Sequence, residues 1–335
     1  MKAAFYQKAI DPFERCFWKA QIGILRACPP LLGVVSGVSL GADKSPRVWL
    51  KTLLQATARV PGAAFRHWRN KKDNRLVLPR ITVVVTTRCT LRCDKCLAHI
   101  PDLKCNRDVP VGDLTEDIRS LLSCVDIIYD VNLSGGEAFL HPGLDEIIRT
   151  FADSGKVGNL NVTTNGTVIP DTAVLAALRE AKANVKISRY PCTVQPGAGR
   201  LKCILKENGI PYTHESGIFW RDPDGLAFRR RMAGLGRIQE GPEKQRFSIC
   251  YQQLGFPYCN GKLYLCCESA LASEEGHITA CEKDYVDFRA ASPAASCEQI
   301  QKLLKSRVTS ACAYCHGYTY KTPKVPVAVQ RGVRD

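Results

Sequence analysis

Residues 81 to 96 read ITVVVTTRCTLRCDKC, and this stretch decides the fold. Its first part, Ile81 to Thr86, is a continuous run rich in β-branched residues, which is typical of a strand buried on both faces of a parallel sheet. The part that follows places Cys89, Cys93 and Cys96 in the loop after this strand. Because ligands gather at the C-terminal ends of parallel strands, we expect the three thiols at the functional edge of the sheet.

The residues after this strand alternate between helix and strand patterns. Helices are expected near 112–123, 143–153, 170–182 and 197–208, and strands near 126–133, 159–164, 184–188 and 211–214. Such alternation predicts stacked βαβ units and hence an α/β fold. Five or six repeats are too few for a closed eightfold barrel. The sequence therefore predicts a partial (β/α)6 barrel over residues 76–244.

Two regions flank the predicted barrel. Residues 1–75 are interpreted as a basic helical N-terminal extension, which ends at the polar break RNKKDNR. From residue 245 to 335 the pattern changes to short strands, cysteines and turn residues. Within it, FPYCNGKLYLCC at 256–267 predicts a hairpin around Asn260 and Gly261. We therefore expect a small cysteine-rich module after the barrel.

Cysteine usage points to metal binding. The chain of 335 residues contains 17 cysteines. Disulfides fit poorly, because they dominate small secreted chains, whereas this chain is long, has an odd number of cysteines and opens without a secretory signal pattern. The sequence therefore predicts a cytoplasmic protein with metal-binding cysteines. Six cysteines outside any motif are interpreted as small buried hydrophobic residues: Cys16, Cys28, Cys105, Cys124, Cys192 and Cys203.

The three cysteines after the first strand suit an iron–sulfur cluster. A structural zinc ion takes four ligands, whereas a [4Fe–4S] cluster held by three thiolates leaves one iron open for a small molecule. Zinc stays open as the alternative, because His99 could complete a Cys3His set with Cys89, Cys93 and Cys96.

This loop also resembles a known family. The pattern CxxxCxxC after the first strand of a partial barrel is similar to the signature of the radical S-adenosylmethionine (SAM) superfamily. Motifs at the ends of the next three strands look like further landmarks of that family: Ser134-Gly135-Gly136-Glu137, Thr163-Thr164-Asn165-Gly166 and Ser188-Arg189. One departure is Lys95, at a position where many members carry an aromatic ring against the adenine of SAM.

The resemblance implies a set of cofactor-binding residues. Cys89, Cys93 and Cys96 would hold the SAM-binding [4Fe–4S] cluster. The residues implied in SAM binding are Ser134, Gly135, Gly136, Glu137, Thr164, Asn165, Ser188 and Arg189. Glycine permits a close approach of the cofactor, and the carboxylate of Glu137 suits the amino group of SAM.

The C-terminal cysteines resemble a second family element. Their spacing is similar to that of the twitch module, the shortened form of the SPASM extension, which binds one auxiliary [4Fe–4S] cluster. The implied ligands are Cys250, Cys266, Cys312 and Cys315. A four-cysteine zinc ribbon stays open. The substitutes, if this ligand set is wrong, are Cys259, Cys267, Cys281 and Cys297.

Family membership would also imply an activity. Members cleave SAM reductively to methionine and a 5′-deoxyadenosyl radical, which abstracts a substrate hydrogen, and a one-electron donor such as flavodoxin or ferredoxin is the expected partner. His214 and Glu215, at the end of the strand near 211–214, are the expected catalytic acid or base residues. The first hypothesis is oxidation or epimerisation of a sugar, cyclitol or other small polyol. The alternatives are a peptide-modifying (RiPP maturase) enzyme and a non-catalytic iron–sulfur or zinc protein that binds nucleic acid. The SAM-binding landmarks argue against the last.

Charge gathers at the N-terminus. The chain has a net charge of +15, and residues 1–80 hold 15 Lys or Arg against 4 Asp or Glu, a net of +11. Cations beside aromatic residues suit a membrane surface, a nucleic acid or an anionic substrate, and a solvated cationic face is the plain alternative. The uncharged run at 27–42 is shorter than the ~20 residues that cross a bilayer. Contact with a membrane surface is therefore expected, rather than a membrane span.

Overall fold

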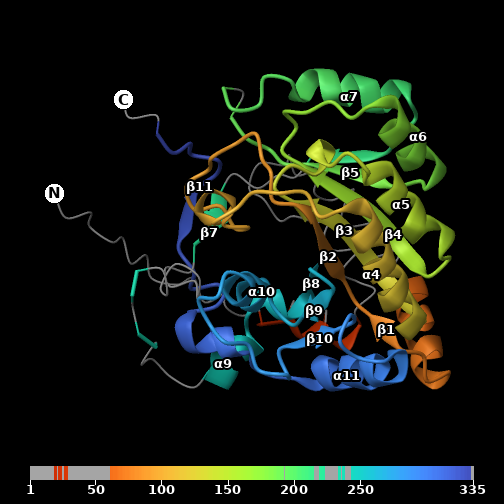
Figure 1. The fold of residues 1–335 in the computed structure, drawn as a ribbon, viewed down its shortest axis with the longest axis vertical. Helices are drawn as coiled ribbons and strands as arrows, with labels where there is room; N and C mark the ends of the chain where they lie inside the picture. The colour runs from red at the N-terminus through yellow and green to blue at the C-terminus, as the bar shows by residue number, and fades with distance from the viewer. Residues whose placement is uncertain are drawn as a thin grey trace.

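A nine-stranded sheet organises the part of the protein that the structure describes. Figure 1 shows how its strands and the helices are arranged. The computed structural model describes residues 19–20, 22–24, 26–28, 61–191, 193–214, 219–222, 233–234, 236–237 and 243–332. The expectations placed on Cys16, Cys192, Glu215 and most of the N-terminal extension lie outside these residues.

Five parallel strands and the helices between them form the predicted α/β unit. The strands are β2 (Ile81–Thr86), β3 (Ile127–Gly135), β4 (Val157–Thr164), β5 (Asn184–Ile187) and β6 (Tyr212–His214). The helices are α4 (Val111–Cys124), α5 (Leu144–Asp153), α6 (Thr172–Glu180) and α7 (Ala198–Glu207). Each lies within a few residues of its predicted position. The α/β fold with a parallel sheet is confirmed.

The two faces of β2 have different neighbours. Ile81, Val83 and Val85 are fully buried in the hydrophobic core that the sheet shares with α4. Thr82 and Val84 alternate with them and line a cavity on the other face. Because side chains alternate along a strand, one face of the sheet packs on helices and the other forms the inside of the partial barrel.

A further parallel strand comes from the C-terminal module. β8 (Phe256–Cys259) pairs in parallel with β2, on the edge opposite to β3. β9 (Lys262–Tyr264) returns antiparallel to β8, and β10 (Tyr285–Asp287) follows it. The predicted hairpin is confirmed, and its turn residues have positive φ, 49° at Asn260 and 74° at Gly261. The cysteine-rich module thus extends the barrel sheet.

The other elements surround this sheet. Residues 61–72 are helical and precede β1 (Val77–Leu78), which pairs with β3. The C-terminal module adds α9 (Glu243–Ser248), α10 (Cys267–Glu274) and α11 (Pro293–Lys305), which lie in the same part of Figure 1 as β8 to β10. β7 (Phe219–Arg221) and β11 (Lys324–Pro326) form a separate antiparallel pair. Within the described residues, no helix is long and apolar enough to cross a membrane.

Candidate functional site

The loop after β2 presents the three predicted cluster cysteines. Cys93 is buried, and Cys89 and Cys96 are half-buried. The backbone N–H of Leu91 donates to Sγ of Cys89 (3.4 Å), and Nε2 of Gln330 donates to Sγ of Cys93 (3.2 Å). Such donors stabilise thiolates, the form that binds iron. Burial raises the pKa of Cys89, and that of Cys93 to about 11, so a bound metal cation would be needed to keep them ionised at neutral pH.

His99 does not gather with these cysteines. Its side chain is fully buried, and Nε2 lies 3.5 Å from Oε1 of Glu268 in α10. A zinc ion needs four ligands within about 2.3 Å of one point. Among the described residues, no three His, Cys, Asp or Glu side chains are arranged around one point in this way. The imidazole of His99 thus faces Glu268, which argues against its use in a Cys3His zinc site.

The glycine pair after β3 lies against the cysteine loop. The N–H of Gly136 donates to Thr86 O, and that of Glu137 donates to Arg88 O, both at 2.8 Å. A Cβ atom on Gly135 would lie 2.1 Å from Thr86 O, and one on Gly136 would lie 2.0 Å from Arg88 O. Any side chain would therefore push the two loops apart. The protein's own backbone already requires these glycines, whatever their role toward SAM.

Glu137 ties the ends of β3 and β4 together. Its side chain is fully buried and accepts hydrogen bonds from the N–H of Phe139 (3.1 Å), the hydroxyl of Thr164 (2.8 Å) and the N–H of Asn165 (2.7 Å). Burial raises the pKa of Glu137 to about 7. The carboxylate is thus a buried brace between two motifs, and its contact with the amino group of SAM stays a prediction.

Asn165 reaches from the end of β4 to the cysteine loop. Its Nδ2 donates to Oγ1 of Thr90 (3.0 Å) and lies 3.6 Å from Sγ of Cys89. Its Oδ1 accepts a hydrogen bond from the N–H of Thr167 (2.9 Å). The structure therefore brings Cys89, Glu137 and Asn165 into one hydrogen-bonded assembly.

The end of β5 also faces this assembly. Ser188 donates its N–H to Thr164 O (2.9 Å), whereas Arg189 is exposed. Tyr190, the next residue, is half-buried, and its ring meets that of Trp220 edge-on with 5.9 Å between centroids. Burial raises the pKa of Tyr190, and the neighbouring thiols, Cys93 first among them, add to this rise. Tyr190 is therefore close to the cluster loop.

His214 lies apart from the cysteine loop. It ends the edge strand β6, is exposed, and its Nδ1 is 3.4 Å from Nζ of Lys202. Burial and the charge of Lys202 lower its pKa. His214 is not among the residues that line the large cavity described below. Its catalytic role and that of Glu215 stay predictions.

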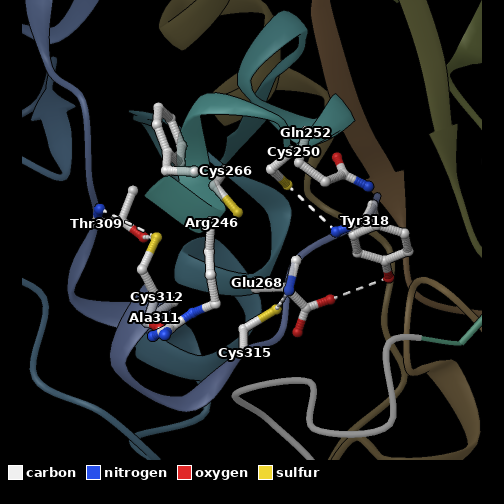
Figure 2. Close-up of a pocket in the computed structure, with 12 residues that line it drawn as sticks. Arg246, Cys250, Gln252, Cys266, Glu268, Thr309, Ala311, Cys312, Cys315 and Tyr318 are labelled. Carbon is white, nitrogen blue, oxygen red and sulfur yellow. Dashed lines mark hydrogen bonds between the residues drawn. The ribbon is translucent and has the colours of Figure 1, made fainter. Parts of the chain in front are cut away.

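Four cysteines line one cavity in the C-terminal module, and Figure 2 shows their side chains around it: Cys250, Cys266, Cys312 and Cys315. They are the predicted auxiliary ligands. The N–H of Tyr318 donates to Sγ of Cys250 (3.3 Å), and the N–H of Gly317 donates to Sγ of Cys315 (3.2 Å). Burial raises the pKa of Cys250 to about 12 and also raises that of Cys315. Buried thiols with N–H donors fit an iron–sulfur cluster.

The substitute cysteines are placed elsewhere. Cys259 and Cys267 line the large cavity, not the four-cysteine cavity. Cys297 in α11 donates to the carbonyl oxygen of Cys124 (S···O 3.6 Å). Cys281 is also absent from the walls of the four-cysteine cavity. The geometry therefore favours the predicted ligand set over its substitutes.

A large cavity of about 420 Å³ opens on the inner face of the sheet. Ser134 and Gly135 line it together with residues of β2, β8 and α10, most of them apolar. Cys266 and Cys267 are adjacent in the chain, yet Cys266 lines the four-cysteine cavity and Cys267 lines the large one. The two cavities therefore share a thin wall. The volume of the large cavity lies in the range of small-molecule sites.

Two polar residues, one buried and one half-buried, were missed by the sequence reasoning. Glu268 is 1% exposed, lines the four-cysteine cavity and accepts a hydrogen bond from the hydroxyl of Tyr318 (3.3 Å). Its position two residues after Cys266 was the available signal. Gln330, the donor to Cys93, lies 237 positions away from that residue. No local pattern connects them.

Comparisons with known proteins agree with this site. The chain is 30% identical over 105 residues to a GTP 3′,8-cyclase of Pelotomaculum thermopropionicum, and 35% identical over 104 residues to one of Microcystis aeruginosa. Each match covers 30% of this chain and 30% of the relative, so the chain spans less than a third of the relatives it matches. No family model matches the chain.

Solved structures give a weaker likeness. Native anSMEcpe with bound AdoMet has 13% identity and a TM-score of 0.43, over 68% of this chain and 82% of that one. BtrN in complex with AdoMet and 2-DOIA has 15% identity and a TM-score of 0.42, over 71% and 92%. Taken together, the CxxxCxxC loop, the motifs at the ends of β3 and β4, and the cyclase matches support membership of the chain in the radical SAM superfamily of enzymes.

Proposed function

We propose that this protein cleaves SAM reductively at a [4Fe–4S] cluster held by Cys89, Cys93 and Cys96, and removes a hydrogen atom from a small polar substrate. The net reaction is oxidation or epimerisation of a sugar, cyclitol or other small polyol. A second, auxiliary [4Fe–4S] cluster completes the reaction.

One observation carries this proposal. The four cysteines of the twitch-like pattern, spread from Cys250 to Cys315, line a single buried cavity. The four-cysteine cavity and the large cavity meet at Cys266 and Cys267. The large cavity is the one that Ser134 and Gly135 line. This arrangement supports transfer of an electron between a substrate in the large cavity and the auxiliary site.

The chain's own residues would hold and orient the reacting groups. When bound, SAM and its cluster supply a carbon radical that abstracts hydrogen. Glu137 and Asn165 brace the cysteine loop against the ends of β3 and β4, which fixes the position of Cys89. The large cavity has both apolar residues and polar ones in its walls, so it offers hydrogen-bonding groups to a polar substrate. Tyr190, which follows β5 and lies near the cysteine loop, is a candidate contact for the substrate.

Cavity size favours a small molecule over a peptide. At about 420 Å³ the large cavity matches a sugar-sized or cyclitol-sized ligand. A one-electron donor such as flavodoxin or ferredoxin is the proposed redox partner. Contact with a membrane surface through the basic N-terminal extension is proposed as well.

The test has two stages, both under anaerobic conditions. In the first, SAM and dithionite are added without substrate and 5′-deoxyadenosine is measured. Cys93→Ala is expected to abolish its formation, whereas Cys312→Ala, the matched change at the other site, leaves it largely intact. The second stage offers perdeuterated hexoses and inositols and measures deuterium in 5′-deoxyadenosine. Transfer of deuterium from one of them supports the polyol assignment.

Different failures have different meanings. If wild-type protein forms no 5′-deoxyadenosine, SAM cleavage is not its activity. If deuterium arrives only from a labelled peptide, the peptide-modifying alternative replaces the polyol. If Cys312→Ala turns over a substrate normally, the auxiliary site has no part in the reaction.

A further inference from the structure

The last described segment of the chain crosses the cysteine loop. Residues 328–331, here called the C-terminal strap, follow β11 and run antiparallel to the loop, with Cys93 and Gln330 paired as a β-bridge. The N–H of Asp94 donates to Val329 O (2.5 Å). The strap therefore adds backbone hydrogen bonds to the cysteine loop. Among the described residues, no other segment forms a β-bridge with Cys93.

A clamp at the end of the strap holds it in place. The N–H of Arg331 donates to Arg92 O (2.8 Å). Its guanidinium donates through both terminal nitrogens to the carboxylate of Asp102, with 2.9 Å for the NH2–Oδ2 pair. A bidentate arginine–carboxylate pair fixes direction as well as distance. Both ends of the cysteine loop region are thus tied to the strap.

The side chain of Gln330 is oriented by three contacts. Its Oε1 accepts from the N–H of Arg92 (2.9 Å), and its Nε2 donates to Ala328 O (2.8 Å) and to Sγ of Cys93 (3.2 Å). These partners decide which end of the amide carries the nitrogen. Cys93 itself is 6% exposed, so water has little access to compete for its sulfur. Gln330 therefore supplies a fixed N–H donor to one predicted cluster ligand.

A donor at a ligand sulfur changes the energetics of a cluster. Reduction adds negative charge, which is shared by the thiolate sulfurs, and an N–H donor stabilises that charge. We propose that Gln330 is a positioning residue that raises the reduction potential of the SAM-binding cluster by hydrogen bonding to Cys93, and that the C-terminal strap holds it there. This inference rests on the proposed function, because it takes Cys89, Cys93 and Cys96 as the cluster ligands.

The origin of the strap gives this contact a wider consequence. The segment that contains Cys312 and Cys315 continues through β11 into the strap. This one segment therefore supplies two predicted ligands of the auxiliary site and the hydrogen-bond donor to Cys93.

A redox titration followed by electron paramagnetic resonance tests the proposal on the full-length reconstituted protein. The SAM-binding cluster is recognised by the change that added SAM makes in its signal. Gln330→Leu keeps the size of the side chain and removes the donor. We expect its SAM-responsive cluster to have a more negative midpoint potential, with iron content unchanged. Val329→Ala, a half-exposed neighbour in the same strap, is the matched control and should leave the potential unchanged.

An unchanged or higher potential in Gln330→Leu, with full iron content, overturns the proposal. If that variant takes up no iron at the site, the midpoint potential is measured in Arg331→Gln instead. It loosens the clamp on Asp102 but keeps the Gln330 amide, so a smaller shift to negative potential is expected, and no shift contradicts the proposal. If wild-type protein shows no SAM-responsive signal at all, the cluster assignment fails instead.

Discussion

Lys95, which lies between two of the predicted cluster ligands, forms an ion pair with Asp222 just after β7, with 2.7 Å between Nζ and Oδ2. The backbone of Lys95 is left-handed, with φ of 54°, a conformation that costs energy in a residue other than glycine. Related enzymes often carry an aromatic ring at this position. Here the side chain links the cysteine loop to Asp222, so any stacking contact with adenine must come from another residue.

This pair predicts an asymmetry in stability. The Lys95 side chain is 39% exposed, whereas that of Asp222 is 7% exposed. Lys95→Met leaves a buried carboxylate without this cation, and we expect it to lower the free energy of unfolding by about 2 kcal/mol. Asp222→Asn leaves an ammonium that water can solvate, so its cost should stay below about 1 kcal/mol. Denaturant unfolding of both variants measures the difference, and equal or reversed costs would contradict it.

Gly136→Ala should disrupt the SAM-binding site selectively. The new Cβ would lie 2.0 Å from Arg88 O and 3.2 Å from Cβ of Cys89, so the cysteine loop must move. We expect loss of 5′-deoxyadenosine formation and of about half the iron. Gly112→Ala is the control, because a Cβ there meets nothing within 4 Å. A Gly136→Ala protein with full iron content and normal SAM cleavage would show that the close approach is unimportant.

Glu137 should make stability depend on pH. Burial raises its pKa from 4.5 to about 7 in the folded state. The unfolded chain therefore releases this proton first, and the contribution of Glu137 to stability, complete below about pH 4.5, is lost as pH rises to about 7. The shift corresponds to about 3 kcal/mol. Between about pH 5 and about pH 8, wild type should lose more unfolding free energy than Glu137→Gln. Parallel pH profiles for the two proteins would contradict the shift.

The helix at residues 61–72 belongs to the basic extension, and it suits a membrane surface. Phe65 and Trp68 are 58% and 57% exposed, their ring centroids lie 5.8 Å apart, and Nζ of Lys72 lies 5.5 Å from the Trp68 ring. Exposed aromatic rings beside cations bind anionic lipid surfaces. We expect the protein to sediment with anionic liposomes at low salt, and Phe65→Ala with Trp68→Ala to weaken this binding.

The control for this prediction is Tyr212→Ala, an exposed aromatic residue in the edge strand β6. It should leave sedimentation unchanged. Binding must also weaken in rising salt, because exposed charges are screened over about 10 Å at 0.1 M. If the double variant still sediments with liposomes, the membrane role of the helix is wrong. Its role would then be structural, through the hydrogen bond from Asn70 to Tyr129 of β3.

Local patterns predicted the barrel elements well, because each depends on nearby residues. The run at Ile81 to Thr86 and the Asn260-Gly261 turn carry their conformations in their own side chains and backbone preferences. The parallel pairing of β8 with β2 had no such signal, since it joins residues 175 positions apart and depends on the packing of the whole sheet. A local sequence pattern does not indicate which of two strands so far apart in the chain will pair.

The site shows the same division. The spacing of the cysteines along the sequence indicated which four thiols line the C-terminal cavity. Gln330 and His99 could not be placed, because their partners are set by tertiary structure. The strand-end position suggested a catalytic role for His214, but β6 is an edge strand and its end is exposed.

Metal analysis after anaerobic reconstitution tests the central claim, two [4Fe–4S] clusters in one chain, most directly. We expect about eight irons and about eight sulfides per wild-type chain, and about four of each both in Cys93→Ala and in Cys312→Ala. Each variant should keep the cluster that the other loses. One tightly bound zinc ion per site, with no iron–sulfur absorption, would contradict the account and restore the zinc alternatives.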